Sequence, residues 1–277
     1  MGNLYVVATP IGNLEDITLR AIKILQDVTL IAAEDTRVTR KLLTRYGLHT
    51  KLTSYHDHNK TEKLSIILDA LKLGDVALVS DAGTPVISDP GMDLVAAAAD
   101  NGITVVPIPG PSAPVAALSV SGLDPRQFLF LGFLPRRKAD RLDLLNNVST
   151  LPYTLIIFEA PHRFNQTLGD FLNTLGDRRI SVIREATKAY EEIFRGSVRD
   201  GMLHFTKPRG EFTIVIAGMY KEKDTISSEL VRQELDALLQ AGLNGRDARE
   251  ALSKHTGISR REAYDVWLKS KANPISE

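Results

Sequence analysis

The sequence predicts an α/β fold in which buried strands alternate with helices. Short apolar runs recur along the chain, each ends in a loop rich in Gly, Pro or Asp, and a stretch with helical periodicity follows. Apolar runs without alternation are typical of strands covered on both faces, as in a parallel sheet with helical crossovers. Ligands bind beyond the carboxyl ends of such strands, so a site is expected in the loops that follow them.

The first part of the chain contains four predicted strands, at residues 4–8, 28–33, 76–80 and 103–107. After the first strand, Asp16 is the predicted N-cap of a helix whose apolar positions include Ile17 and Leu25. The loops that end the four strands are residues 9–13, 34–37, 81–85 and 109–114. A composition shift at residues 107–114 indicates a domain boundary there.

Beyond that boundary, further strands are predicted at residues 128–133, 154–158, 180–183 and 212–216, with a helix at residues 164–175. From Ser228 the pattern is helical, and Leu235, Leu238 and Leu239 mark one apolar face. The predicted organisation is an N-terminal α/β domain at residues 1–113, a C-terminal α/β domain at 114–221 and a small helical module at 222–277.

Composition narrows the class of protein. The 277 residues include no cysteine, which excludes disulfides, thiolate metal sites and cysteine nucleophiles and favours a reducing cytoplasm. We expect no membrane segment, because no apolar run reaches the ~18 residues that a membrane span requires. Lys and Arg total 34, as do Asp and Glu. This balance argues against nucleic-acid binding by bulk charge but says nothing about local basic patches.

Common cofactor and nucleophile motifs are absent from the sequence. The first strand is not followed by G-x-G-x-x-G, and neither a P-loop nor a G-x-S-x-G nucleophile elbow is present. His56 and His58 flank Asp57, but this is too few well-placed ligands for a metal site, and we expect no metal. What remains is a pocket of Gly/Pro loops and small residues, which suits a flat and weakly charged cofactor.

Several motifs together resemble those of the tetrapyrrole-methylase superfamily. They are Thr9-Pro10-Ile11-Gly12-Asn13, Ala33-Glu34-Asp35-Thr36-Arg37, the run from Ser80 to Gly91, Pro109-Gly110-Pro111-Ser112-Ala113, Glu159-Ala160-Pro161-His162-Arg163, Arg184-Glu185-Ala186-Thr187-Lys188 and Gly210-Glu211-Phe212-Thr213. The resemblance covers roughly residues 4–269 and is closest to a branch that 2′-O-methylates a cytidine in the decoding region of small-subunit ribosomal RNA.

The resemblance implies two α/β domains with S-adenosylmethionine in the cleft between them, and a homodimer. It also implies a set of cofactor-binding residues, which are Pro10, Asp81, Ala82, Gly83, Thr84, Ile87, Ser112, Ala113, Phe158 and Ala186. Many tetrapyrrole methylases have Gly-Asp-Pro where this chain has Gly83-Thr84-Pro85, so a role of that aspartate does not transfer to Thr84.

Methyl transfer to a ribose hydroxyl requires positioning and a group that takes the hydroxyl proton. Asp35, at the end of the second predicted strand, is the first candidate for the base, and Arg37 is predicted to bind a phosphate. Glu185 and Lys188 form a second candidate pair, because a lysine lowers the pKa of a nearby hydroxyl. The alternative is that both pairs are ordinary ion pairs at strand ends.

Ribosomal RNA, in an assembled subunit, is the implied partner. The densest basic cluster is Arg136-Arg137-Lys138 with Arg141, and phosphate contacts there would make binding weaken steeply with salt. Arg260 and Arg261 follow a turn in the tail that resembles a helix-turn-helix corner, which is predicted either to contact RNA or to pack in a dimer. The rival functions are methylation of a tetrapyrrole or other small molecule, and non-catalytic binding of S-adenosylmethionine.

Overall fold

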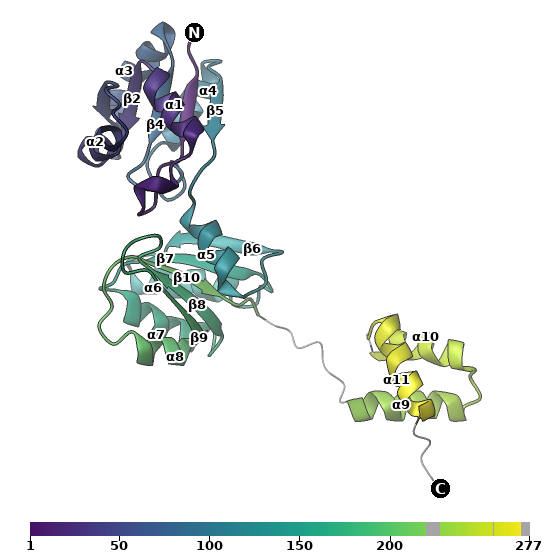
Figure 1. Ribbon diagram of the computed structural model, residues 1–277. Coiled ribbons are helices and arrows are strands. Elements are labelled where there is room, and N and C mark those ends of the chain that lie inside the picture. The colour runs from purple at the N-terminus through teal and green to yellow at the C-terminus, as the bar shows by residue number, and fades with distance from the viewer. Residues whose placement is uncertain (220–227, 257, 273–277) are drawn as a thin grey trace. The chain divides into compact units, whose positions relative to one another are not determined.

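The computed structural model describes residues 1–219, 228–256 and 258–272. The chain divides into two compact units, Met1–Met219 and Tyr220–Glu277. In the first unit, Figure 1 shows two lobes that each contain a sheet. The predicted domain boundary at 221/222 lies outside the described residues, and the three-domain division stays a prediction.

The N-terminal lobe is built on a parallel sheet with strand order β3-β2-β4-β1-β5. Its strands are β1 (Leu4–Val7), β2 (Leu30–Ala33), β3 (Leu52–Ser54), β4 (Val76–Val79) and β5 (Val105–Ile108). Its helices are α1 (Leu19–Asp27), α2 (Thr36–Arg45), α3 (Lys60–Leu73) and α4 (Met92–Asp100). Buried residues of α1 and α2 share a core with one face of the sheet, and those of α3 and α4 share a core with the other face. The carboxyl ends of β1, β2 and β4 therefore meet at one edge of the sheet.

The C-terminal lobe has a mixed sheet with strand order β6-β7-β10-β8-β9, in which β6 pairs parallel with β7 and the other neighbours pair antiparallel. The strands are β6 (Phe128–Phe133), β7 (Thr154–Glu159), β8 (Arg179–Arg184), β9 (Glu192–Ser197) and β10 (Phe212–Ile216). The helices are α5 (Ala113–Ser121), α6 (Lys138–Val148), α7 (Phe164–Thr174) and α8 (Val198–His204). Helices α6, α7 and α8 pack on one face, and α5 packs on the other.

The second unit contains three helices within its described residues, α9 (Ser228–Gln240), α10 (Gly245–Thr256) and α11 (Arg260–Ala272). They share a small core made of Val231, Leu235, Ala248, Leu252 and Ala263. Leu238 and Leu239, predicted to share a face with Leu235, pack against this core.

The predicted fold class is confirmed, and the four strands predicted in each lobe are present within a few residues of their expected bounds. Two strands were missed. Residues 52–54 form a strand of only three residues, and residues 192–197 are mostly half-buried and include two charged side chains. Neither has the continuous apolar run that marks a buried strand.

The predicted helix start at Asp16 is wrong. Residues Leu14–Asp16 form a short 3₁₀ turn, and the N-cap of α1 is Thr18, whose side-chain oxygen accepts a hydrogen bond from the backbone N–H of Ala21 at 3.1 Å. Thr18 has an extended backbone conformation, which is typical of an N-cap residue.

Thr18→Ala is expected to lower the free energy of unfolding by about 1 kcal/mol, because the N–H of Ala21 loses its side-chain acceptor. Asp16→Ala is the matched control and should have a much smaller effect, since Asp16 does not cap α1. Urea denaturation of both variants checks the prediction, and a larger loss for Asp16→Ala would contradict the cap assignment.

No helix in the described part of the chain is long and apolar enough to cross a membrane.

Candidate active site

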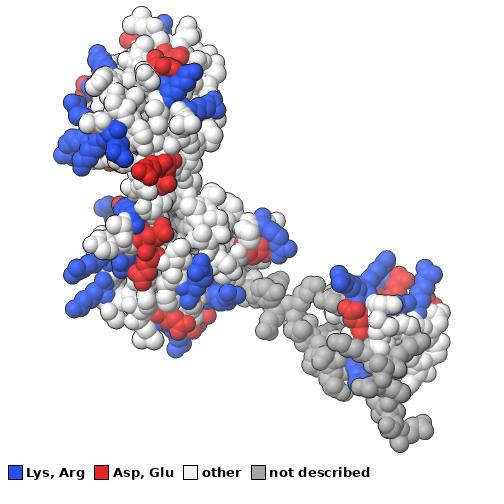
Figure 2. Space-filling view, viewed as in Figure 1, with Lys and Arg blue, Asp and Glu red and all other residues white. Residues whose placement is uncertain are grey.

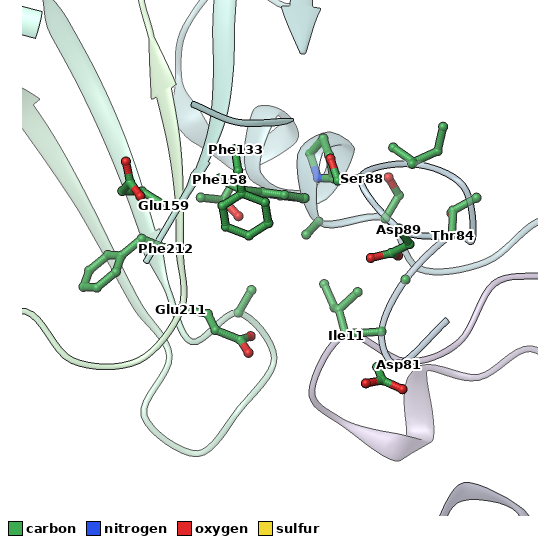
Figure 3. Close-up of a pocket in the computed structure, with 18 of the residues that line it drawn as sticks. Ile11, Asp81, Thr84, Ser88, Asp89, Phe133, Phe158, Glu159, Glu211 and Phe212 are labelled. Carbon is green, nitrogen blue, oxygen red and sulfur yellow. The ribbon is translucent and has the colours of Figure 1, made fainter. Parts of the chain in front are cut away.

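A cavity of about 330 Å³ lies between the two lobes of the first unit. Figure 3 shows Ile11, Asp81, Thr84, Ser88 and Asp89 on one side and Phe133, Phe158, Glu159, Glu211 and Phe212 on the other. Its remaining lining residues are Glu34, Ala82, Gly83, Ile87, Ser112, Ala113, Pro114, Ala160, Ile183, Ala186 and Thr213. The size and the mixture of apolar walls with a few polar groups are typical of a small-molecule site.

Nine of the ten predicted cofactor-binding residues line this cavity. They are Asp81, Ala82, Gly83, Thr84, Ile87, Ser112, Ala113, Phe158 and Ala186. Pro10 does not: it is buried, and its neighbour Ile11 faces the cavity instead. The structure thus gathers loops that lie far apart in the sequence, and the role of each residue in binding stays a prediction.

The loop after β4 has an unusual backbone where it borders the cavity. Val86 and Ser88 have φ angles of 76° and 69°, in the left-handed region that residues other than glycine rarely adopt and that is least favourable for a β-branched valine. On the opposite lobe, Gly132 comes so close that a Cβ atom there would lie 2.9 Å from the Ser88 hydroxyl oxygen. Such strain persists only where the surroundings enforce it, and it is commonest at functional sites. Here the strained backbone belongs to the loop whose residues Ile87 and Asp89 line the cavity.

Backbone hydrogen bonds join the first loop to this same loop. Thr9 and Gly83 exchange two N–H···O bonds of 2.8 and 3.0 Å, and the Thr84 hydroxyl donates to the carbonyl of Pro111 at 3.3 Å. Gly83 has a φ of 77°, which favours glycine at this position. The three loops that follow β1, β4 and β5 are therefore fixed to one another at the cavity.

Three carboxyl groups of the N-terminal lobe line the cavity, and each has a raised pKa. Burial is the largest cause for Glu34, Asp81 and Asp89, and the charges of neighbouring carboxylates add to it. The pKa of Asp89 is raised to about 6, with the nearby Glu34 as the second cause. The backbone N–H of Asp81 also donates to Glu34 Oε2 at 3.1 Å, which ties the ends of β2 and β4 together. A carboxyl group with a pKa near the working pH is suited to accepting a proton.

Asp35 does not line the cavity. Its carboxylate accepts a hydrogen bond from the backbone N–H of Arg37 at the start of α2 and forms an ion pair of 2.6 Å with the Arg37 guanidinium. These contacts lower the pKa of Asp35 to about 2, with the Arg37 side chain as the largest cause. A carboxylate this acidic is a weak base, and these contacts match the alternative of an ordinary ion pair. The catalytic role of Asp35 stays a prediction.

Glu185 and Lys188 lie beside the cavity and do not line it. The Lys188 ammonium donates to Glu185 Oε1 at 3.0 Å and to Oε2 of Glu211, a cavity residue, at 2.9 Å. Burial alone would lower the pKa of Lys188, but its hydrogen bonds with Glu211 and Glu185 outweigh burial and raise it. Lys188 is therefore a cation that acts on the cavity through Glu211, and its role stays a prediction.

The segment that carries Glu185 and Lys188 also touches the N-terminal lobe. The hydroxyl of Thr187 accepts a hydrogen bond from the backbone N–H of Asn13 at 2.9 Å. A Cβ atom on Gly12 would lie only 2.6 Å from Lys188 Cγ and 2.7 Å from the carbonyl oxygen of Ala186. The close approach of the two lobes at this end of the cavity therefore requires a glycine at position 12.

Aromatic rings of the C-terminal lobe form part of the cavity wall. The Phe158 ring centroid lies 5.0 Å from that of Phe130 and 5.5 Å from that of Phe133. Phe133 is 57% exposed even though it lines the cavity. An exposed ring beside an open site is available to contact a flat ligand.

Arg136, Arg137 and Lys138, predicted to bind RNA, are exposed where β6 leads into α6. Arg141 was predicted to bind RNA with them, and the structure contradicts this prediction. Its side chain is only 1% exposed, and its Nε donates to Asp170 Oδ2 at 2.7 Å. A guanidinium buried in this way cannot reach a phosphate of a bound RNA.

Arg260 and Arg261 are exposed at the start of α11, and their role in RNA binding stays a prediction. In the same unit, the Arg249 guanidinium lies 5.0 Å from the Tyr264 ring centroid and 4.7 Å from that of Trp267. Gly257, in the predicted turn before α11, lies outside the described residues.

Among the described residues no group of three or more His, Asp and Glu side chains is arranged to hold a metal ion. In Figure 2, Lys and Arg are spread over both lobes of the first unit, and acidic side chains are visible near the junction of the lobes.

Sequence reasoning assigned no role to several residues that line the cavity. They are Ile11, Glu34, Ser88, Asp89, Pro114, Phe133, Glu159, Ala160, Ile183, Glu211, Phe212 and Thr213. Most of them lie in the motifs that carry the family resemblance. Their position after predicted strand ends indicates that they lie near a site, but the sequence alone does not reveal which side chains of a loop face the cavity.

Comparison with known proteins defines the class. Residues 3–200 match the family model of the tetrapyrrole (corrin/porphyrin) methylases, and the chain belongs to this family. A relative from Synechocystis, named ribosomal RNA small subunit methyltransferase I, is 46% identical over 99% of this chain and 100% of its own length. A relative of the same name from Thermotoga maritima is 48% identical over 79% of this chain and 99% of its own length.

Among solved structures, a uroporphyrin-III C-methyl transferase from Thermus thermophilus complexed with S-adenyl homocysteine has a TM-score of 0.57 and 19% identity. The match covers 78% of this chain and 97% of that chain. At this identity the likeness establishes the fold of the two lobes.

Proposed function

We propose that this protein transfers a methyl group from S-adenosylmethionine to the 2′-hydroxyl of a cytidine in the decoding region of small-subunit ribosomal RNA. The proposal is carried by the 46% sequence identity, over 99% of this chain, with a relative named ribosomal RNA small subunit methyltransferase I. The cavity between the lobes is the proposed place of reaction. The choice of cytidine and of the 2′-oxygen rests on the resemblance to the branch with that activity.

The cavity fits S-adenosylmethionine chemically. Adenine needs an apolar slot, which Phe158, Ile87 and Ile183 provide, and small residues such as Ala82 and Ala113 leave space for the sugar. Carboxylates in the wall suit hydroxyl and ammonium donors. When bound, the cofactor supplies an electrophilic methyl group.

Phe158→Ala is expected to weaken S-adenosylmethionine binding by about tenfold, because the cavity loses the apolar area of one ring. Phe128→Ala is the matched control, since Phe128 is on the same sheet, is 45% exposed and does not line the cavity. Calorimetric titration with the cofactor checks this, and equal affinities for the two variants would contradict the placement.

The residues of the chain then have two tasks, to hold the ribose and to take the proton of its 2′-hydroxyl. Asp89 is the best-placed proton acceptor, because it lines the cavity and its pKa is raised to about 6 by burial and by Glu34. Lys188 remains a candidate for electrostatic support through Glu211. Accepting a proton in this way typically accelerates a reaction by about 10² to 10⁴-fold.

We also propose that the substrate is the assembled small subunit, that the protein works in the cytoplasm and that it is a homodimer. Exposed apolar residues on α5, namely Val115 and Val120, support self-association. Analytical ultracentrifugation at several concentrations tests the dimer, and a single monomeric species at micromolar concentration would contradict it.

The proposed activity is tested by mapping 2′-O-methylation across small-subunit RNA from cells with and without the protein. One cytidine in the decoding region should lose its methyl group when the protein is absent and regain it when purified protein and cofactor are added to those subunits. An unchanged methylation map would refute the proposal. Transfer of labelled methyl groups to small molecules only would favour the tetrapyrrole-type activity, and cofactor binding without transfer to either would favour a non-catalytic role.

A further inference from the structure

Three exposed basic residues lie in the loop between β6 and α6 and at the first position of α6, and the backbone of this loop is held from inside the lobe. Arg141 Nη1 donates to the carbonyl oxygens of Pro135 and Arg136, both at 3.2 Å. Its Nε donates to Asp170 of α7, and both side chains of this ion pair are almost fully buried. Arg141 thus connects the loop to the core of the lobe.

A second guanidinium, that of the partly buried Arg163, holds the same loop from the side of the cavity. Arg163 Nη2 donates to the carbonyl oxygen of Leu134 at 2.8 Å and to that of Pro135 at 3.3 Å. Its Nε lies 3.4 Å from Oε1 of Glu159, a fully buried carboxylate that lines the cavity. The backbone of the loop is therefore fixed relative to the cavity wall.

The three exposed basic side chains have few acidic partners to neutralise their charge. Arg137 lies 3.7 Å from Asp140, an exposed pair of small expected strength. Arg136 and Lys138 form no ion pair within the described part of the chain, and both are exposed. Phe133, which immediately precedes the loop, lines the cavity. We call Arg136, Arg137 and Lys138 the basic rim.

We propose that Arg141 and Arg163 hold the basic rim in a preset position beside the cavity, where it binds backbone phosphates of the RNA strand next to the target ribose. The inference rests on the proposed function and adds the surface that receives the substrate. A loop fixed in advance loses less conformational freedom on binding than a mobile one, so more of each phosphate interaction appears as affinity. Arg141 and Arg163 are positioning residues, and neither is required to touch RNA.

The rim is tested by Arg136→Gln/Arg137→Gln/Lys138→Gln in the full-length protein. Binding to small ribosomal subunits should weaken by about tenfold or more, and the slope of log Kd against log salt should fall by about 0.7 to 0.9 for each phosphate that the rim no longer binds. Affinity for S-adenosylmethionine should not change. The charge-matched control is Arg20→Gln/Lys23→Gln/Lys207→Gln, three exposed cations away from the cavity. Equal binding by the rim and control variants would overturn the proposal.

The positioning role is tested by Arg163→Gln, which keeps all three rim charges. Subunit binding should weaken by about threefold to tenfold with the salt slope of the wild type, because the cations still reach the phosphates but are no longer held in position beforehand. Arg163→Lys should restore part of the affinity, since a lysine still donates to a loop carbonyl. When added to the rim variant, Arg163→Gln should have almost no further effect. An equal effect in both backgrounds would indicate a merely structural role and overturn the positioning.

The outcomes separate this inference from the proposed function. If the rim variants bind subunits weakly but the wild type does not methylate the expected cytidine, the proposed function is refuted and the proposal about the basic rim is supported. If the cytidine is methylated and the rim variants bind normally, only the proposal about the basic rim is refuted. A wild type that does not bind subunits refutes both.

Discussion

Asp89→Asn is expected to lower kcat by about 10² to 10⁴-fold, because an amide cannot accept the proton of the ribose hydroxyl. Asparagine has nearly the same shape as aspartate, so the strained loop around Val86 and Ser88 should be retained. The affinity for S-adenosylmethionine should change much less than kcat. The measurement is single-turnover methylation of small subunits at saturating cofactor.

The pH dependence provides a second readout for Asp89. A base must be ionised to act, so kcat/KM of the wild type should rise with pH through about 6 and level off above it. The rise should disappear in the residual activity of Asp89→Asn. A profile that stays flat down to pH 5 would contradict the assignment.

The stability of Asp89→Asn distinguishes lost chemistry from lost structure. Burial raises the pKa of Asp89, so the folded protein binds its proton more tightly than the unfolded chain does, and ionisation destabilises the fold. The stabilising contribution of the protonated group is complete below about pH 4 and lost as the pH rises through about 6. The neutral variant should therefore have an unchanged or higher Tm at pH 7.5. A clear drop in the Tm of Asp89→Asn would indicate that its activity is lost through misfolding.

Asp35→Asn is the matched control for Asp89→Asn. Asp35 has a pKa of about 2 and pairs with Arg37 outside the cavity, so its replacement should leave kcat nearly unchanged. A large fall in kcat for Asp35→Asn with normal turnover of Asp89→Asn would restore the assignment made from sequence.

The predicted cofactor loops come together at one cavity for a physical reason. Small and Gly-rich loops after the parallel strands leave little choice in where a ligand enters, and Gly83, Ser112 and Ala113 all line the cavity as expected. The second lobe contributes through strand ends, and Phe158 is placed by its position near the end of β7. In both lobes the local sequence pattern indicates where strands end, and the loops after those strand ends line the cavity.

The choice between charged residues could not be made from sequence. Asp35 and Asp89 both follow strands within charged motifs, but one caps a helix and the other enters a cavity. The difference depends on local backbone geometry, including the left-handed conformation of Ser88 beside Asp89. Serine is not among the residues that favour this conformation, so the sequence does not indicate it at position 88.

Arg141 illustrates the same limit at longer range. It belongs to a run of basic residues, and three of the four are exposed as that pattern suggests. Its burial depends on Asp170, which is 29 residues further along the chain on α7. Only the packing of α6 against α7 reveals that this arginine is internal and that Arg136 and Arg137 are not.

Asp170→Leu is expected to lower the free energy of unfolding by about 3 to 5 kcal/mol, because it leaves the Arg141 guanidinium buried without its counter-ion. Arg141 Nη2 already has no hydrogen-bond partner, so the loss of Asp170 would leave Nε of the same buried guanidinium without its partner as well. Urea denaturation at pH 7 measures the loss. A loss no larger than that of Asp69→Leu, in an exposed pair with Lys72, would contradict the importance of burial.

The double variant Asp170→Leu/Arg141→Met separates stability from substrate binding. Replacing both members of a buried ion pair by apolar residues is often neutral or stabilising, so most of the loss from Asp170→Leu should be recovered. The carbonyls of Pro135 and Arg136 nevertheless lose the guanidinium that holds them. We therefore expect a stable protein with normal cofactor affinity and weakened subunit binding. If subunit binding recovered together with stability, Arg141 would serve only the core of the lobe.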